Sequence, residues 1–324
     1  MTLPRRPGMT LPLPGPLHSH RDRLRELADL GYTDVWSAES DTCDGFTPLA
    51  LAAAWEPRLR LGTAIIPAFT RAPAVMAQSV ASLADAAPGR FAFGIGTSSN
   101  VIVERWNGVP FTEPYKRVRD MVRFLRLAFT GEKITQKFDS FEVQGFRLGI
   151  KPEVPPKILV AGLREGMLRL AGRESDGAII NWLSPDDVPR VASVVRNEGD
   201  DKEIVCRIFV CPSEDAVTVR QAAKFAIAAY LNVPVYAAFH EWLGRGDVLR
   251  PMWDAWQSGD RKGALAAIPD ELVDELIVHG SPAQCRARIL QYFDNGVTTS
   301  SLAIMPLAPL DFWQALRDLA PSAG

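Results

Sequence analysis

The residues best suited to chemistry lie in the stretch RFAFGIGTSSNVIVERWNGVPF, which begins at Arg90. Its first part is apolar and rich in aromatic side chains, which predicts a buried parallel strand. That strand ends in two glycines and is followed by hydroxyl side chains: Gly94 and Gly96, then Thr97, Ser98 and Ser99. Bare backbone and short donors suit a flat polar cofactor ring that approaches the main chain closely. A tight strand-to-helix turn is the alternative, and the glycine spacing does not match a Rossmann fingerprint.

A second informative stretch runs from Val160 to Trp182, VAGLREGMLRLAGRESDGAIINW. A strand leads into Gly162, and a helix is predicted to begin within a few residues. Free N–H groups at such a helix start form an anion site, which the helix dipole reinforces and to which Arg164 can add charge. The alternative is an ordinary strand-to-helix loop, because glycine before a helix is common.

Classical catalytic side chains are scarce at the predicted strand ends. These ends hold no histidine, no lysine and no pair of carboxylates, and Glu39 stands there without an acidic partner. The nearby serines have no histidine close to any strand end, so a hydrolytic triad is not expected. Such a site fits a protein in which a cofactor carries the chemistry and the chain supplies binding and orientation.

Composition excludes several other classes of function. The chain of 324 residues has a formal net charge of −2 and no basic cluster, which argues against a nucleic-acid or membrane-surface role. Its four cysteines show no CxxC spacing and its four histidines no HExxH motif, so no metal site is predicted. The proline-rich N-terminus does not resemble a signal peptide, and we expect a cytoplasmic protein that acts on a small molecule.

Eight predicted strands alternate with predicted helices along the chain. The economical architecture is a single α/β domain over residues 1–324, a (β/α)₈ TIM barrel with insertions. A doubly wound open sheet is the alternative. We expect disorder in residues 1–8, a hairpin insertion at 131–150 and a helical insertion at 231–277. The predicted strands are Met9–Leu13, Thr33–Ser37, Arg60–Ile66, Phe91–Gly96, Lys157–Ala161, Gly177–Asn181, Glu203–Val210 and Val297–Ile304.

Four segments together resemble one known family. LRLAGRESDGAIINW is similar to the LAGRxADG segment of the bacterial luciferase-like monooxygenase superfamily. LGYTDVWSAES, LGTAIIP and FAFGIGTSS are similar to the motifs of its second, third and fourth strands. The resemblance runs from about Met9 to Ala320 and is closest to the branch that uses the deazaflavin coenzyme F420.

The resemblance implies positions for a cofactor. The deazaflavin ring would lie at the barrel mouth and the phosphate tail would meet the amides that open the helix after Gly162. The family often carries a non-proline cis peptide in the third strand, which falls here between Ala64 and Ile65. The cofactor-binding residues implied are Ser37, Glu39, Ala64, Ile65, Gly96, Thr97, Ser98, Ser99, Asn100, Gly162, Leu163, Arg164, Glu165 and Gly166.

The resemblance also shapes the expectations for the substrate side. Sugar-phosphate dehydrogenases of the superfamily carry a histidine and a glutamate where this chain has Ser40 and Ser99, so glucose-6-phosphate oxidation is not expected. Glu39 is the remaining candidate for a ring contact or proton donor, unless backbone amides simply satisfy it. Trp106 and Trp182, with Ser40, are candidates to line the substrate pocket, although packing is the usual role of an aromatic residue near a strand end.

By this resemblance, the expected function is an F420-dependent oxidoreductase that transfers hydride between ring carbon C5 and a small organic substrate. One alternative is an FMN-dependent monooxygenase that uses reduced flavin and oxygen. A further alternative is a non-catalytic flavin- or deazaflavin-binding protein. The superfamily commonly forms homodimers, and the apolar segment 225–243 is either an interface or core.

Overall fold

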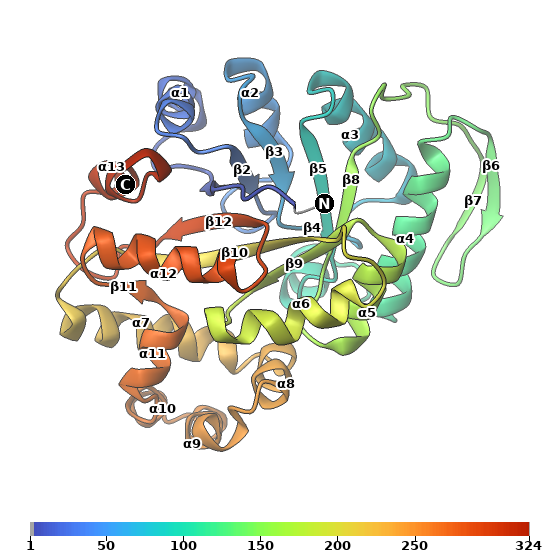
Figure 1. The fold of residues 1–324 in the computed structure, drawn as a ribbon. Coiled ribbons are helices and arrows are strands. Elements are labelled where there is room, and N and C mark those ends of the chain that lie inside the picture. Colours follow the sequence, from blue (N-terminus) through green and yellow to red (C-terminus); the bar gives the residue numbers. More distant parts are fainter. Residues whose placement is uncertain (1–2, 324) are drawn as a thin grey trace.

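Eight parallel strands close into a barrel in the computed structural model, which describes residues 3–323. Each strand pairs in parallel with the next, and the last strand pairs with the first through Met9 and Leu302. This closure confirms the TIM barrel and excludes the open sheet (Figure 1). The barrel strands are β1 (Gly8–Leu11), β2 (Asp34–Ser37), β3 (Arg60–Thr63), β5 (Phe91–Gly96), β8 (Lys157–Ala161), β9 (Gly177–Asn181), β10 (Glu203–Cys211) and β12 (Thr299–Ile304).

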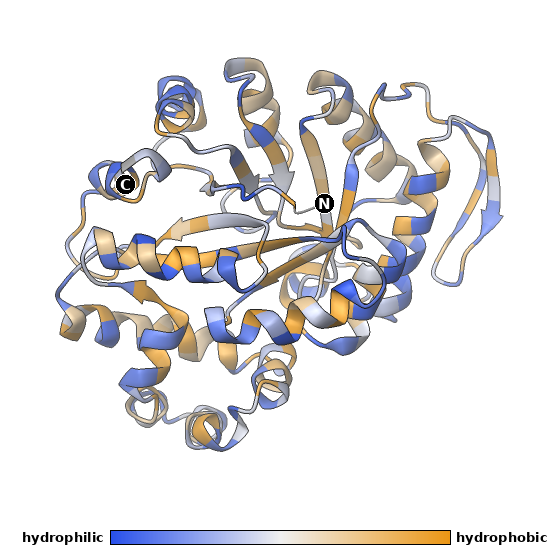
Figure 2. Cartoon of the chain, in the orientation of Figure 1, coloured by the Kyte–Doolittle hydropathy of each residue, from blue (hydrophilic) through white to orange (hydrophobic). Residues whose placement is uncertain are grey.

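Helices surround the barrel and turn their apolar faces toward the strands. The colouring by hydropathy shows this alternation of apolar and polar sides on most helices (Figure 2). Side chains between helices and strands form the principal core, for example Leu27, Phe124 and Ile180. The surrounding helices are α1 (Arg21–Asp29), α2 (Thr47–Trp55), α3 (Pro73–Ala86), α4 (Pro114–Ala128), α5 (Glu165–Glu174), α6 (Val188–Arg196), α12 (Pro282–Asp294) and α13 (Phe312–Asp318).

Two insertions interrupt the repeat. The hairpin β6 (Ile134–Lys137) and β7 (Glu142–Phe146) lies within the segment 131–150 where a hairpin is expected. The helical insertion follows β10 and starts earlier than expected, because α7 packs on the insertion helices α8, α10 and α11 and shares an apolar cluster with them. Its elements are α7 (Ala216–Leu231), α8 (Pro234–Trp242), α9 (Gly246–Gln257), α10 (Arg261–Ala266), α11 (Asp270–Leu276) and the short strand β11 (Val278–His279).

The start of the chain is ordered where the sequence predicts disorder. Residues 1–2 of that segment lie outside the described residues. The Arg6 amide donates to the Thr298 carbonyl at 2.8 Å, and its carbonyl accepts from the Ser300 amide at 3.0 Å. These hydrogen bonds extend the β1–β12 pairing and satisfy main-chain groups that would otherwise need water.

Within residues 3–323 no single helix is long and apolar enough to cross a membrane. Helices α7 and α8 reach that length only as a pair, and the chain bends by 102° between them.

An apolar layer fills the middle of the barrel. Trp36 lies across Gly62, where a Cβ would come within 2.2 Å of the indole ring, so glycine makes room for the largest side chain of the layer. Leu159, Ile179 and Val205 pack with Trp36 in this layer. The middle of the barrel is therefore a packed core rather than a channel, as is usual for an eight-stranded barrel.

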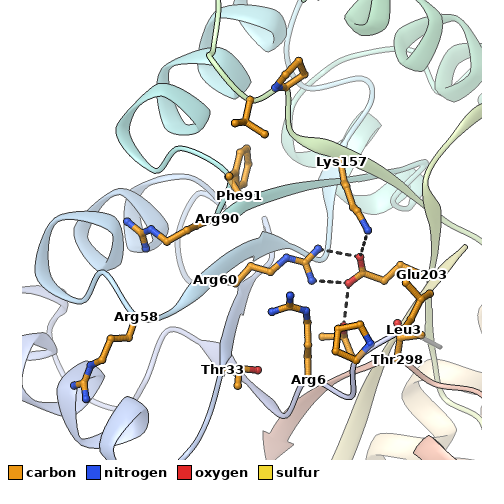
Figure 3. Close-up of a pocket in the computed structure, with 15 residues that line it drawn as sticks. Leu3, Arg6, Thr33, Arg58, Arg60, Arg90, Phe91, Lys157, Glu203 and Thr298 are labelled. Atoms are coloured by element: carbon orange, nitrogen blue, oxygen red, sulfur yellow. Dashed lines mark hydrogen bonds and ion pairs between the residues drawn. The ribbon is translucent and has the colours of Figure 1, made fainter. Parts of the chain in front are cut away.

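A cavity of about 510 Å³ lies at the N-terminal end of the strands and is lined by charged side chains (Figure 3). At this end the Arg60 guanidinium donates to Glu203 Oε2 at 2.9 Å and to Asp34 Oδ1 at 3.3 Å. Lys157 Nζ and the Thr299 hydroxyl also donate to Glu203, at 3.4 and 2.9 Å. We call these five residues the basal ion network. Burial raises the pKa of Glu203, but Arg60 and Lys157 outweigh burial and hold that pKa below its ordinary value.

Candidate active site at the C-terminal mouth of the barrel

The wall between β3 and β5 has an irregular main chain. The Ala64–Ile65 peptide is cis, as the resemblance implies, and the short strand β4 (Ile66–Pro67) then continues the pairing with β5. The Thr63 hydroxyl accepts from the Gly94 amide at 2.7 Å and donates to the Gly94 carbonyl at 2.9 Å. A side chain of β3 thus fixes the backbone of β5 directly below the irregular segment.

The side chains of Ser37 and Glu39 bond to residues of the loops around the mouth. Ser37 is fully buried and its hydroxyl donates to the Gly45 carbonyl, so it holds a loop instead of facing a ligand. The Glu39 carboxylate pairs with Arg71 and accepts from the Thr70 hydroxyl at 3.0 Å, while its amide donates to the Ile65 carbonyl at 3.1 Å. Both carboxylate oxygens are therefore engaged. This arrangement favours a positioning role for Glu39 beside Ile65, and the ring contact or proton-donor role expected from the sequence stays a prediction.

The loop after β5 presents free polar groups. Ser98 has φ +61°, and the Ser99 hydroxyl accepts from the Ile102 amide at 3.3 Å at the start of a π-helix, Val101–Trp106. Among residues 3–323 neither the Ser98 hydroxyl nor the Asn100 side chain finds a hydrogen-bond partner, and Thr97 donates only to a neighbouring carbonyl. The loop therefore has polar groups that a ligand could use, and the cofactor site expected here from the sequence stays a prediction.

The start of α5 offers a second set of donors. Leu168 is the first amide that bonds back into the helix, to the Arg164 carbonyl at 3.0 Å. No described side chain caps this end, and the amides of Glu165, Gly166 and Met167 have no acceptor among residues 3–323. At Gly166 no atom lies within 4 Å of the place a Cβ would take. This uncapped, open helix start fits a phosphate group.

Other residues of this predicted site have simpler roles. The Gly162 amide donates to the Ile179 carbonyl at 3.1 Å, and a Cβ on Gly162 would meet the Leu168 amide at 3.1 Å, so this glycine permits close packing. Leu163 packs partly on the main core, and the side chains of Arg164 and Glu165 are exposed. Gly96 packs against Ala161 in the same way.

The three residues expected to line a substrate pocket differ widely in exposure. Ser40 is exposed, and among residues 3–323 its hydroxyl pairs only with Thr42. Trp106 is 54% exposed at the end of the π-helix. Trp182 is 1% exposed, with its ring centroid 4.2 Å from that of Phe209 and 4.8 Å from that of Tyr230. Trp182 is buried in the apolar cluster that it shares with the helical insertion, and its place in a substrate pocket stays a prediction.

Sequence reasoning missed Arg207, Asn181 and Tyr236. Arg207 on β10 is in register with Asn181 on β9, whose side-chain amide donates to the Tyr236 hydroxyl at 3.2 Å. Strand residues two apart point to the same face, so Arg207 points into the barrel like Val205 of the apolar layer. A charged residue at an inward position of an apolar strand was the available signal.

His240 on α8 makes stability depend on pH. Its side chain is fully buried, and neither ring nitrogen makes a hydrogen bond of good geometry, although the main chain of Trp182 lies near it. Burial and the nearby Arg245 lower the pKa of His240 to about 4 from 6.5. Folding disfavours the protonated ring, so the unfolded chain binds more protons between these two values. We expect stability to be full above pH 6.5 and to fall by about 3 kcal/mol as pH drops to 4.

Urea unfolding of wild type and His240→Leu at several pH values checks this expectation. The difference between the two proteins isolates the histidine, since the carboxylates titrate in both. A difference that does not change between pH 7 and 4.5 would contradict it.

These features define a TIM-barrel protein with polar groups on the β5 loop and unbonded amides at the start of α5. Residues 1–299 match the model of the luciferase-like monooxygenase family, and the chain belongs to that family. It is a luciferase-like oxidoreductase, in a family for which a flavin-type cofactor, F420 or FMN, is typical.

The similarity to known proteins extends over the whole barrel. The 5,10-methylenetetrahydromethanopterin reductase of Methanolobus tindarius is 28% identical over 309 residues, which is 90% of each chain. The coenzyme F420-dependent tetrahydromethanopterin reductase of Methanopyrus kandleri has a similar structure, with a TM-score of 0.80 at 17% identity over 98% of both chains. An F420-dependent secondary alcohol dehydrogenase, solved with an F420–acetone adduct, has a similar structure with a TM-score of 0.78 at 16% identity. The match covers 99% of this chain and 100% of the dehydrogenase chain.

Proposed function

We propose that this protein is an F420-dependent oxidoreductase that transfers hydride to or from a small organic substrate. The observation that carries the proposal is the similarity over nine-tenths of the chain to a methylenetetrahydromethanopterin reductase. The two similar structures described above are of proteins named as F420-dependent, which supports the same cofactor.

The chain's own residues suit this cofactor. Ala64 and Ile65 offer a small, partly buried apolar surface. The polar loop Thr97–Asn100 follows the neighbouring strand β5. The free amides of Glu165 and Gly166 suit a phosphate. A bound deazaflavin supplies two-electron chemistry at carbon C5 and lacks the nitrogen through which flavins activate oxygen. Arg71 and Glu39 hold the loop that contacts Ile65, so they fix the surface on which the ring rests.

A fluorescence titration of the purified protein with coenzyme F420, and separately with FMN, tests the proposal. We expect saturable binding of F420 at micromolar concentration or below and much weaker binding of FMN. Preference for FMN would move the protein to the oxygen-using branch of the family. Binding of neither would overturn the proposal.

Gly166→Asp tests the place of the cofactor tail. A carboxylate at the open start of α5 would occupy the amides and repel a phosphate, so we expect F420 affinity to fall about 10- to 100-fold. Gly149→Asp is the matched control, because a Cβ there also meets no atom within 4 Å. Equal affinities of the two variants would place the tail elsewhere.

A further inference from the structure

Arg207 is a shielded cation without a counter-charge. Its Nε atom is completely covered and has no hydrogen-bond partner, and no described residue accepts a hydrogen bond from the rest of its guanidinium. The group stacks over the Phe209 ring, 5.2 Å from the centroid. The residue as a whole is only partly covered. It follows Val205 of the apolar layer along β10 and therefore lies on the side of that layer toward the mouth.

Other shielded arginines in the described part of the chain each have at least one hydrogen-bond acceptor, unlike Arg207. Arg60 pairs with Glu203 and Asp34, and Arg245 pairs with Asp187 and Glu275. Arg117 and Arg196 donate to backbone carbonyls. A cation removed from water without a partner is costly, and an anionic group on a ligand would relieve that cost.

The strand registers place Arg207 opposite the cis peptide. Traced from Arg207 through β12, β1 and β2, the register reaches the third strand at Arg60. Traced the other way, through β9, β8 and β5, it reaches Phe69 just beyond β4. The two traces end at different residues because neighbouring strands of a tilted barrel are staggered along its axis. The residues of the third strand at the same height as Arg207 along the barrel axis therefore lie midway between Arg60 and Phe69, at Ala64–Ile65. Strands β3 and β10 are four apart in a barrel of eight, so these positions face each other across the mouth.

We infer that Arg207 binds a carboxylate or equivalent compact oxyanion of the substrate, so that the enzyme acts on a small organic anion. This inference rests on the proposed function, in which the ring lies on Ala64–Ile65 and leaves its other face toward β10. A guanidinium matches the two oxygens of a carboxylate with parallel N–H donors. Asn181 and Tyr236 lie beside it and offer a further amide and hydroxyl. Phe209 and Tyr230 provide aromatic surface for the body of the substrate.

Calorimetric titration of the F420-loaded protein with benzoate, cyclohexanecarboxylate and propanoate, each against its neutral amide, tests the inference. We expect at least one acid to bind wild type about ten-fold or more tightly than its amide. Arg207→Gln should weaken that acid about 10- to 100-fold and leave the amide unchanged, while Arg207→Lys keeps part of the preference because it keeps the charge. Arg250→Gln, on the exposed side of α9, is the charge-matched control.

Two further measurements separate the outcomes. Arg207→Gln should melt at the same temperature as wild type or higher, because it removes an unpaired buried charge; a clear loss of stability would indicate a structural arginine and overturn the inference. F420 affinity, measured separately, should be unchanged in this variant; a loss of affinity would assign Arg207 to the cofactor and also overturn the inference.

If F420 binds to wild type but no acid is preferred over its amide, the inference about Arg207 fails and the proposed function stands. If F420 does not bind wild type at all, the proposed function fails first, and the inference fails with it.

Discussion

Glu203→Gln is expected to lower the free energy of unfolding by about 3–5 kcal/mol. The Glu203 and Arg60 side chains are only 5% and 12% exposed, and the carboxylate accepts from Arg60, Lys157 and Thr299 together. The amide cannot balance the guanidinium, and its NH₂ group would face donors, so a buried cation and unpaired donors remain. Chemical unfolding at pH 7 measures the loss.

Two variants make this prediction specific. Asp294→Asn breaks an ion pair with Arg5 whose side chains are 59% and 54% exposed, and its cost should not exceed about 1 kcal/mol. The double variant Arg60→Met, Glu203→Leu should recover only part of the loss, because it removes the unbalanced cation but leaves the buried Asp34 carboxylate without Arg60. If Glu203→Gln were as mild as Asp294→Asn, the basal ion network would not stabilise the barrel.

Gly94→Ala is expected to prevent folding or to cost more than about 4 kcal/mol. A Cβ at this position would lie 1.9 Å from the Thr63 carbonyl oxygen and 2.3 Å from Ile179 Cδ1. The first of these atoms belongs to the backbone and cannot move without breaking the two hydrogen bonds between Thr63 and Gly94. The displaced segment leads directly into Ala64–Ile65, so the proposed ring surface should be lost as well.

Thermal unfolding and expression in soluble form measure this effect, with Gly149→Ala as the control. Gly149 has open space where a Cβ would go and requires no positive φ, so its substitution should be neutral. A soluble Gly94→Ala protein with the melting temperature of wild type would show that β3 and β5 can separate at the mouth.

Much of the fold could be predicted from the sequence because each barrel strand is a short apolar run bounded by glycine, proline or polar residues. Closure of the sheet could be proposed from eight such runs, and the β1–β12 pairing confirms it. The packing of α7 on the insertion helices was not predicted, since helical periodicity indicates an apolar face but not the element that covers it. The order of Arg6 was also missed, because it depends on a strand nearly 300 residues later.

The candidate site was predictable where it depends on local backbone. The loop at Thr97–Asn100 and the open start of α5 follow from glycines, hydroxyls and a helix boundary, all visible along the chain. The partners of Glu39 are not visible in this way, because Thr70 and Arg71 lie across a loop more than 30 residues away. Arg207 was missed for a related reason: its importance lies in the absence of a partner, which only the three-dimensional arrangement reveals.

The apolar layer around Trp36 divides the barrel into two electrically distinct ends. On β10, Glu203 and Arg207 are four residues apart, a separation of about 13 Å along a strand, and Val205 of the layer stands between them. The two residues share no partner, and Glu203 is already neutralised by its own cations. Their substitutions should therefore combine additively. Substitutions at the base of such a barrel can therefore change its stability, and substitutions at the mouth can change its ligand selectivity, independently of one another.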